Sequence, residues 1–380
     1  MKPSLDLTAT FSSRLGLPFN TFVALTWGAY SHYIKLSSDS LASIPEQFEM
    51  RPDYYWRTSV SEQYVVNFFK AVSRELDEFH TLLESRNSRA EDDWTVLHQY
   101  PMVRTPEKTF VPVDPLFLID KAGRGVYWTL FETLANKDRH LLFGFWGKVF
   151  ERYVNDQIKE NYAAGGRLIL NPTFTDGNEA CDACLMEGTH LTLFEHKSSV
   201  LRIEKYGSDP SNLQNDLDMK FVEGEPDSPK GVAQFGRTIE RFLAGDAISG
   251  ITSRQITKIY PVMICHEVSM AAPLMTKYLN GRFRKAGLAR KYKKTITPLF
   301  VIAVHHFEEF LPHMQNLKMG DLLESYYAGD KQLRLPMTVS TTAILSRENR
   351  GADRLGDRLR QIGQQMMSSL FPNGEIEESQ

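Results

Sequence analysis

Apolar residues recur at intervals of three and four along two long stretches near the start of the chain, residues 19–35 and 61–86. This spacing lines one face of an α-helix, so both stretches are predicted to be helical. The segment between them, residues 37–55, is polar and contains proline, which is typical of a connection between helices. We therefore expect a helical N-terminal region over residues 1–108.

From residue 109 onward the pattern changes to short apolar runs broken by turn residues, which is typical of strands. Gly123-Arg124-Gly125 suggests a hairpin. Helices are predicted at 141–161 and 230–244, and strands at 167–170, 179–186, 190–199, 257–267 and 297–307. Strands interspersed with helices indicate an α/β fold with a mixed sheet covered by helices. We expect this core to span residues 109–310.

Two further segments complete the predicted organisation. Residues 205–229 form a polar stretch rich in Pro, Gly and Asp, and loops of this length are commonly mobile or functional. After residue 310 the pattern is mostly helical, with residues 355–371 as the clearest amphipathic stretch. Residues 311–380 are therefore expected to be a helical extension.

The strand predicted at 190–199 carries charged residues inside an apolar run. Residues two apart in a strand point to the same side, so Glu195 and Lys197 project together while His196 projects away. This alternation predicts a carboxylate and an ammonium on one face of the sheet.

A third charged residue is expected on that face from the preceding strand. Glu187-Gly188 predicts a tight turn between the two strands. For the loop lengths that such a turn allows, Asp182 falls opposite Leu193 or Glu195. The alternative is an exposed strand face with an ordinary cross-strand charge pair.

Asp182, Glu195 and Lys197 suit metal-dependent hydrolysis of a phosphodiester. Two carboxylates can hold Mg²⁺ while leaving water positions open, because magnesium dehydrates reluctantly. The metal lowers the pKa of a bound water and neutralises charge that develops on the phosphate. The ammonium of Lys197 is placed to orient that water or to stabilise the transition state.

This arrangement resembles the D…(D/E)xK signature of the PD-(D/E)XK nuclease superfamily. The likeness extends over residues 140–270, through the helix that carries Glu151 and the helix that carries Gln234. The chain departs from the family pattern in two ways: Cys181, not proline, precedes Asp182, and Thr238 stands where some relatives have tyrosine. The resemblance implies a restriction-endonuclease-like fold.

The resemblance also implies roles for individual residues. Asp182, Glu195 and the backbone carbonyl of His196 would bind Mg²⁺, or Mn²⁺ in its place. Glu151 would support the metal through a direct or water-mediated contact, unless it is a surface residue paired with a neighbouring cation. Gln234 would lie near the chemistry. Lys197 would assist the attacking water.

The helix predicted at 230–244 has a polar face and an apolar face. Lys230, Gln234, Arg237 and Arg241 recur at four, three and four residues, and so share one side of the helix. This stripe is predicted to guide a phosphate backbone toward the metal, and the alternative is a solvated helix face.

A second basic segment spans residues 281–294, which contain seven Lys or Arg and no acidic residue. Arg282, Arg284 and Lys285 are its first members, and Phe283 and Tyr292 offer rings for stacking on bases. This local positive charge matters because the formal net charge of the chain is −3, which is unfavourable for a nucleic-acid enzyme unless cations are gathered in one place. The acidic end, residues 374–380, is expected to be a solvated tail.

Cysteine and histidine provide weaker candidate sites. Cys181 and Cys184 form a C-x-x-C pair that Cys265-His266 could complete as a zinc site, but strand alternation is expected to send the two cysteines to opposite faces. Apolar packing is the favoured interpretation. His305 and His306 are expected at an exposed strand end. Three cysteines in a chain of 380 residues argue against a disulfide framework.

No apolar run long enough to cross a membrane and no export signal are recognised, so we expect a cytoplasmic protein without membrane contact. Nucleotide-binding and nucleophile-elbow motifs are also absent from the sequence. The predicted function is a Mg²⁺-dependent DNA endonuclease. The resemblance suggests bacterial antiviral defence or DNA processing, as a homodimer or with a partner chain. The alternatives are an RNA nuclease and a non-catalytic nucleic-acid-binding or assembly subunit.

Overall fold

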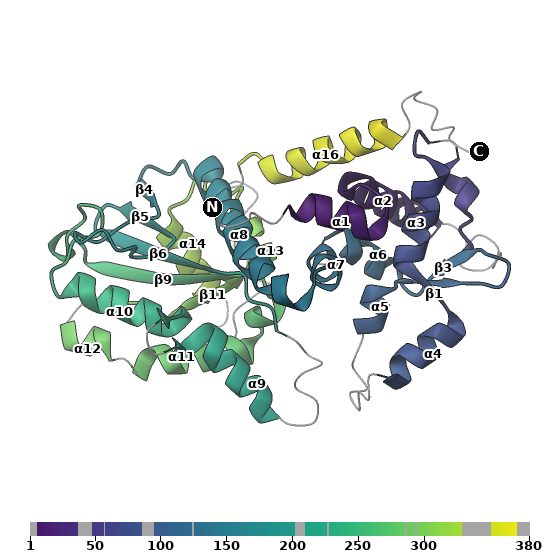
Figure 1. Ribbon diagram of the computed structural model, residues 1–380. Coiled ribbons are helices and arrows are strands. Elements are labelled where there is room, and N and C mark those ends of the chain that lie inside the picture. Colours follow the sequence, from purple (N-terminus) through teal and green to yellow (C-terminus); the bar gives the residue numbers. More distant parts are fainter. Residues whose placement is uncertain are drawn as a thin grey trace. The chain divides into compact units, whose positions relative to one another are not determined.

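The chain forms two compact units, residues 1–144 with 358–380 and residues 145–357 (Figure 1). The computed structural model describes residues 6–36, 48–56, 58–85, 95–123, 125–201, 210–225, 228–285, 287–292, 295–328 and 351–370. The acidic tail at 374–380 and the start of the polar stretch, residues 205–209, lie outside the described residues.

The first unit is mostly helical, in agreement with its apolar spacing. Its helices are α1 (Leu7–Leu15), α2 (Phe19–Leu36), α3 (Glu62–Val72), α4 (Leu76–Ser85), α5 (Thr95–Gln99), α6 (Pro115–Ala122) and α7 (Gly125–Thr133). Its strands, β1 (Ser73–Glu75), β2 (Met102–Arg104) and β3 (Phe110–Pro112), form a small sheet in that order. The helix expected over residues 61–86 is interrupted, because β1 pairs with β2.

The strands and hairpin expected between residue 109 and the helix predicted at 141–161 are mostly helices, so this prediction was wrong. Asp114 accepts a hydrogen bond from the backbone of Leu116 at 2.7 Å, and Pro115 occupies the first helical position. A capping carboxylate followed by proline starts a helix effectively. Helix α6 therefore ends at Ala122, and α7 begins at Gly125. The first unit continues to residue 144, beyond the boundary expected near residue 108.

The second unit is an α/β structure. Its helices are α8 (Arg139–Asn161), which begins within the first unit's range, α9 (Pro210–Leu217), α10 (Gly231–Leu243), α11 (Pro273–Lys285), α12 (Leu288–Tyr292), α13 (Val304–Phe310) and α14 (Met319–Ala328). A further helix, α16 (Arg354–Leu370), begins in the second unit's range and lies mostly in that of the first unit. Its strands are β4 (Arg167–Leu170), β5 (Ala183–Glu187), β6 (His190–Lys197), β7 (Gly224–Glu225), β8 (Ser228–Pro229), β9 (Lys258–Cys265), β10 (Thr295–Ile296) and β11 (Phe300–Ala303).

The main sheet is mixed, as predicted. Its order is β10-β9-β6-β5-β4, with β11 also pairing with β9. The strands β4, β5 and β6 are antiparallel, whereas β9 runs parallel to β6, β10 and β11. Helices α10 and α11 pack on one face, and α8, α13 and α14 pack on the other (Figure 1). The sheet is thus buried between two helical layers.

The hairpin of β5 and β6 has a different turn from the expected one. Glu187 pairs with His190, so the turn is Gly188-Thr189, and Gly188 has φ 63°, a conformation that glycine adopts without strain. Ala183 pairs with Phe194, and the backbone N–H of Asp182 donates to the carbonyl of Phe194 at 3.1 Å. Of the two registers considered, this one sets Asp182 opposite Glu195.

Two other predicted segments differ in detail. Strand β11 ends at Ala303, beside the end of β9 at Cys265, and helix α13 starts at once. His305 and His306 therefore lie on a helix and not at a strand end, and His306 is buried. The polar stretch before α10 also contains a helix, α9.

Candidate metal centre

The candidate centre lies where β5 begins and β6 ends. Asp182 immediately precedes β5, and Glu195 and Lys197 lie at the C-terminal end of β6. On the other side, α8 buries Phe150 and Val154 in the core and carries Glu151 between the two buried positions. The antiparallel register and the packing of α8 together bring acidic side chains from distant parts of the sequence to one end of the sheet.

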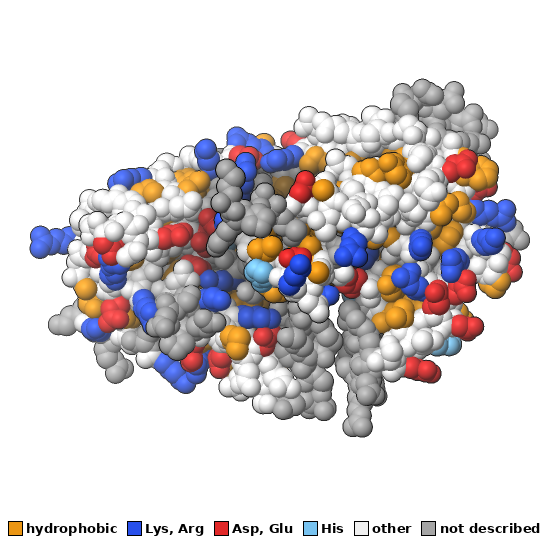
Figure 2. All heavy atoms as spheres, in the orientation of Figure 1, with side chains coloured by type: hydrophobic (Ala, Val, Ile, Leu, Met, Phe, Trp, Pro, Cys, Tyr) orange, Lys and Arg blue, Asp and Glu red, His pale blue; other side chains and the backbone are white. Residues whose placement is uncertain are grey.

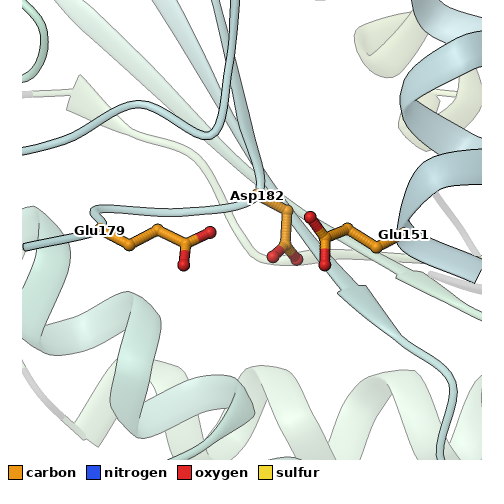
Figure 3. A group of neighbouring side chains, drawn as sticks. All are labelled: Glu151, Glu179 and Asp182. Carbon is orange, nitrogen blue, oxygen red and sulfur yellow. The ribbon is translucent and has the colours of Figure 1, made fainter. Parts of the chain in front are cut away.

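Three carboxylates converge at this point. Glu151, Glu179 and Asp182 each offer an oxygen, and these oxygens all lie within 4.8 Å of one another. Figure 3 shows Glu151 approaching Asp182 from its helix, while Glu179 extends from the segment that leads into β5. Carboxylate oxygens at such separations suit a hard divalent cation. Glu151 was predicted to support a metal, and its carboxylate does reach Asp182.

Glu179 was missed by the sequence analysis. The strand was expected to start at residue 179, which would have made Glu179 one more alternating strand position. The strand starts at Ala183 instead, and the preceding residues form an irregular segment, with a bridge between Thr173 and Glu179. An acidic residue three positions before Asp182 was the only sequence signal, and it has meaning only once the bend is known.

The carboxylate of Asp182 is held in an unfavourable electrostatic environment. Its Oδ2 accepts a hydrogen bond from the backbone N–H of His196 at 2.5 Å. Burial raises the pKa of Asp182 to about 8, and the negative charges of Glu195 and Glu151 add to the rise, which the His196 bond and Lys197 oppose. Such a shift means that the ionised form needs a positive partner that the surrounding side chains do not fully supply.

Glu195, by contrast, has its cation within the chain. It is only 3 % exposed, and Lys197 Nζ donates to its Oε1 at 2.7 Å. The same ammonium donates to Gln234 Oε1 at 3.2 Å, so Gln234 on α10 lies beside Lys197. Burial raises the pKa of Glu195, and Lys197 and a hydrogen bond from Gln234 partly offset that rise. These three side chains form a bonded group.

His196 takes part through its backbone. Its imidazole lies on the opposite face of β6 from Glu195, is buried, and has its pKa lowered to about 3 by burial, so it is neutral. Its N–H points toward Asp182, and in a strand the carbonyl of the same residue points to the same side. This orientation fits the carbonyl ligand that was predicted for His196.

The cysteines behave differently from the expectation. Cys181 and Cys184 do not lie on opposite faces, because Cys181 precedes β5 and escapes its alternation, and both belong to the core cluster beneath α10. Cys265 is in the same cluster. All three are free and buried, and burial raises the pKa of each thiol. Apolar packing explains them, and among the described residues they form no group with metal-ligand geometry.

The predicted basic residues differ in how far they are engaged. Arg241 binds Asp176 and Asp246 at 2.7 and 2.5 Å, and Arg282 binds Glu223. Arg237, Arg282 and Lys285 line a pocket of about 490 Å³ between α10 and α11. Lys230, the N-cap residue of α10, and Arg284 are exposed.

The surface charge is mixed. Figure 2 shows Lys and Arg side chains interspersed with acidic ones on the face in view. Phe283 is buried in the core, so the expectation that its ring is available for stacking was wrong. A position on the buried side of α11, with Leu279 four residues earlier, accounts for this difference.

No protein-family model, no curated protein and no solved structure matched the chain. Across the described residues, no helix has the length and apolar content needed to cross a membrane.

Proposed function

We propose that this chain is a Mg²⁺-dependent nuclease with a restriction-endonuclease-like core in its second unit. The observation that carries the proposal is the position of Asp182 between two groups of polar and charged residues. On one side are the carboxylates of Glu151 and Glu179, and on the other is the bonded group of Glu195, Lys197 and Gln234. This combination of oxygen ligands beside a fixed ammonium is suited to hydrolysis of a phosphate ester.

The donor set fits magnesium. Asp182 and Glu195 would provide carboxylate oxygens, the carbonyl of His196 a third oxygen, and Glu151 and Glu179 direct or water-mediated contacts. Bound Mg²⁺, or Mn²⁺, would supply Lewis acidity toward a phosphate oxygen and a water of lowered pKa. A raised pKa at Asp182 supports this assignment, because a divalent cation stabilises the ionised carboxylates that otherwise repel one another.

Lys197 is the residue best placed to act on the reacting groups. Its ammonium is held by Glu195 and Gln234, which restricts it to one position at the end of β6. From there it can hydrogen-bond an attacking water or a phosphate oxygen and stabilise the charge that develops there. Gln234 is proposed to orient this ammonium.

Nucleic acid is the substrate class that the remaining surface supports. Lys230 and Arg237 on α10, with Arg284 and Lys285 on α11, are exposed cations on the two helices that cover the site's face of the sheet. We assign backbone phosphates to these four. We place Arg241 and Arg282 outside this set because both are only partly exposed and bind carboxylates. DNA is the preferred substrate, and association with a second copy or a partner chain is part of the proposal.

The full chain should be incubated with plasmid DNA, single-stranded DNA and RNA, each with Mg²⁺ and with EDTA. We expect cleavage of DNA that requires Mg²⁺ and is lost in Lys197→Ala, while binding of the same DNA is nearly unchanged. Cleavage of RNA alone would reassign the substrate. Binding without cleavage by the unmodified protein would instead support a non-catalytic nucleic-acid-binding subunit.

A further inference from the structure

Asn171 lies beside the metal centre, although neither the motif nor the acidic cluster includes it. It directly follows β4, and its φ of 48° is in the left-handed region that asparagine tolerates better than most residues. In this conformation its backbone N–H donates to the carbonyl of Asp182 at 2.9 Å. The residue therefore ties the end of β4 to the position from which Asp182 projects.

The side chain of Asn171 reaches the same carbonyl and a second acceptor. The amide group lies 3.1 Å from the carbonyl oxygen of Asp182 and 3.2 Å from Oε1 of Glu151. A carbonyl and a carboxylate oxygen are acceptors, so we assign the amide nitrogen to this side, from which it donates to both. One side chain thus links the backbone of one predicted metal ligand to the carboxylate of another.

The Asn171 amide donates to a carboxylate whose ionised form is disfavoured by its surroundings. The pKa of Glu151 is raised by burial and by the charge of Glu179, and Lys148 opposes that rise. A neutral donor can hold the carboxylate in place without neutralising its negative charge, which remains available to a bound cation. Groups that orient metal ligands in this way commonly change metal affinity by about 10- to 100-fold when removed.

We propose that Asn171 is a positioning residue for the metal centre, which fixes the carboxylate of Glu151 against Asp182 through its side-chain amide. This inference rests on the proposed function for its consequences in catalysis. The contact itself is independent of any activity. Its removal is expected to loosen Glu151 while leaving the fold of the sheet intact.

The test uses two variants that separate the amide from the backbone conformation. Asn171→Gly keeps the left-handed backbone and its N–H bond but removes the donor, and Asn171→Asp keeps the shape but replaces the donor with an acceptor. Mn²⁺ binding to the full chain, followed by electron paramagnetic resonance, should weaken about tenfold or more in both variants. Lys108→Gly, at another exposed left-handed position with φ 62°, should bind Mn²⁺ like the unmodified chain.

Activity gives a second readout. If the amide positions a metal ligand, both Asn171 variants should lower kcat with little change in KM for DNA. Unchanged Mn²⁺ affinity in Asn171→Gly would overturn the inference, because Asn171 would then serve only the turn. Tighter Mn²⁺ binding in Asn171→Asp would also overturn it, because position 171 would then be a site for a further metal ligand.

A double-mutant cycle keeps the inference testable if the chain neither binds metal nor cleaves nucleic acid, which would refute the proposed function alone. Asn171→Gly, Glu151→Ala and the double variant should change the free energy of unfolding non-additively, because the two side chains are bonded and each single variant removes one partner. Strict additivity would mean that no such bond exists.

Discussion

Asp182 lies between two groups of charged side chains that the protein stabilises in different ways. Toward α10, Glu195 is buried but binds Lys197 at 2.7 Å, and Gln234 completes the group. Toward α8, Glu151 and Glu179 bring further negative charge to Asp182. The first group contains its own cation, whereas the second gathers carboxylates.

The difference between the two groups indicates what each contributes. A buried ion pair with its hydrogen bonds satisfied holds both partners in a fixed geometry, which is what a catalytic lysine needs. Clustered carboxylates are unstable as anions, and an external cation relieves the repulsion. We infer that the α10 side of the centre is preorganised and that the α8 side is completed by metal.

Removing the internal cation should have the largest effect. Lys197→Ala is expected to lower kcat for DNA cleavage by about 10³-fold, because an oriented donor at the reacting phosphate is lost. It should also lower the free energy of unfolding by about 3 kcal/mol at pH 8, since buried Glu195 loses its partner. Cleavage assays and chemical denaturation measure the two effects. Lys159→Ala, an exposed position on α8, is the control and should change neither.

Removing the carboxylate of Asp182 should have the next largest effect. The change should reveal how much the ionised carboxylate lowers the free energy of unfolding. Between pH about 4 and about 8, folded Asp182 retains a proton that the unfolded chain has released, so the free energy of unfolding falls as pH rises through this interval. Asp182→Asn removes this dependence. Without metal, the variant should be more stable than the unmodified chain at pH 8 by a few kcal/mol.

Magnesium should reverse that order. Added Mg²⁺ is expected to raise the melting temperature of the unmodified chain at pH 8, because it binds only the folded state, and to leave Asp182→Asn nearly unchanged. EDTA should restore the original difference. The stability of Asp182→Asn and of the unmodified chain should be compared at pH 5 and pH 8, with and without metal. Equal stability of the two proteins under all four conditions would contradict the view that the ionised Asp182 carboxylate is destabilised until metal binds.

The same contrast explains which parts of the centre the sequence predicts. Alternation along β6 correctly separates Glu195 and Lys197 from His196, because the strand is regular and paired on both sides. The spacing along α10 likewise places Gln234 on the side that reaches Lys197. These residues lie in regular elements, where sequence period determines direction.

Irregular segments carry no such period, and the predictions fail there. The segment before β5 bends, so Glu179 turns toward Asp182 and Cys181 turns into the core, neither of which alternation predicts. The start of helix α6 depends on Asp114 and Pro115, whose capping geometry overrides the apolar runs that resemble strands. The turn moves by one residue because Gly188 occupies its first position instead of its second, and Asp182 therefore lies opposite Glu195 and not opposite Leu193.

Neutralising one outer carboxylate should have a smaller effect than changing Asp182. Glu179→Gln is expected to weaken Mg²⁺ binding about tenfold, because one anionic neighbour of the ion is lost while Asp182 and Glu195 remain. Isothermal titration calorimetry measures this change. Glu84→Gln, at an exposed position of α4 in the first unit, should have no effect. Equal affinity in Glu179→Gln and the unmodified chain would restrict the metal to the α10 side of the centre.

The smallest expected effect extends the comparison from carboxylates to cations. Arg284 is exposed, whereas Arg241 is bound by Asp176 and Asp246, so only Arg284 is expected to release counterions when it meets a phosphate. Arg284→Gln should reduce the slope of log Kobs against log salt for DNA binding by about 0.9 and weaken binding a few-fold. Arg241→Gln should leave the slope unchanged in the same filter-binding titration. An equal change in both variants would mean that internal pairing does not prevent an arginine from binding phosphate, and Arg241 would then return to the binding surface predicted from its helical spacing.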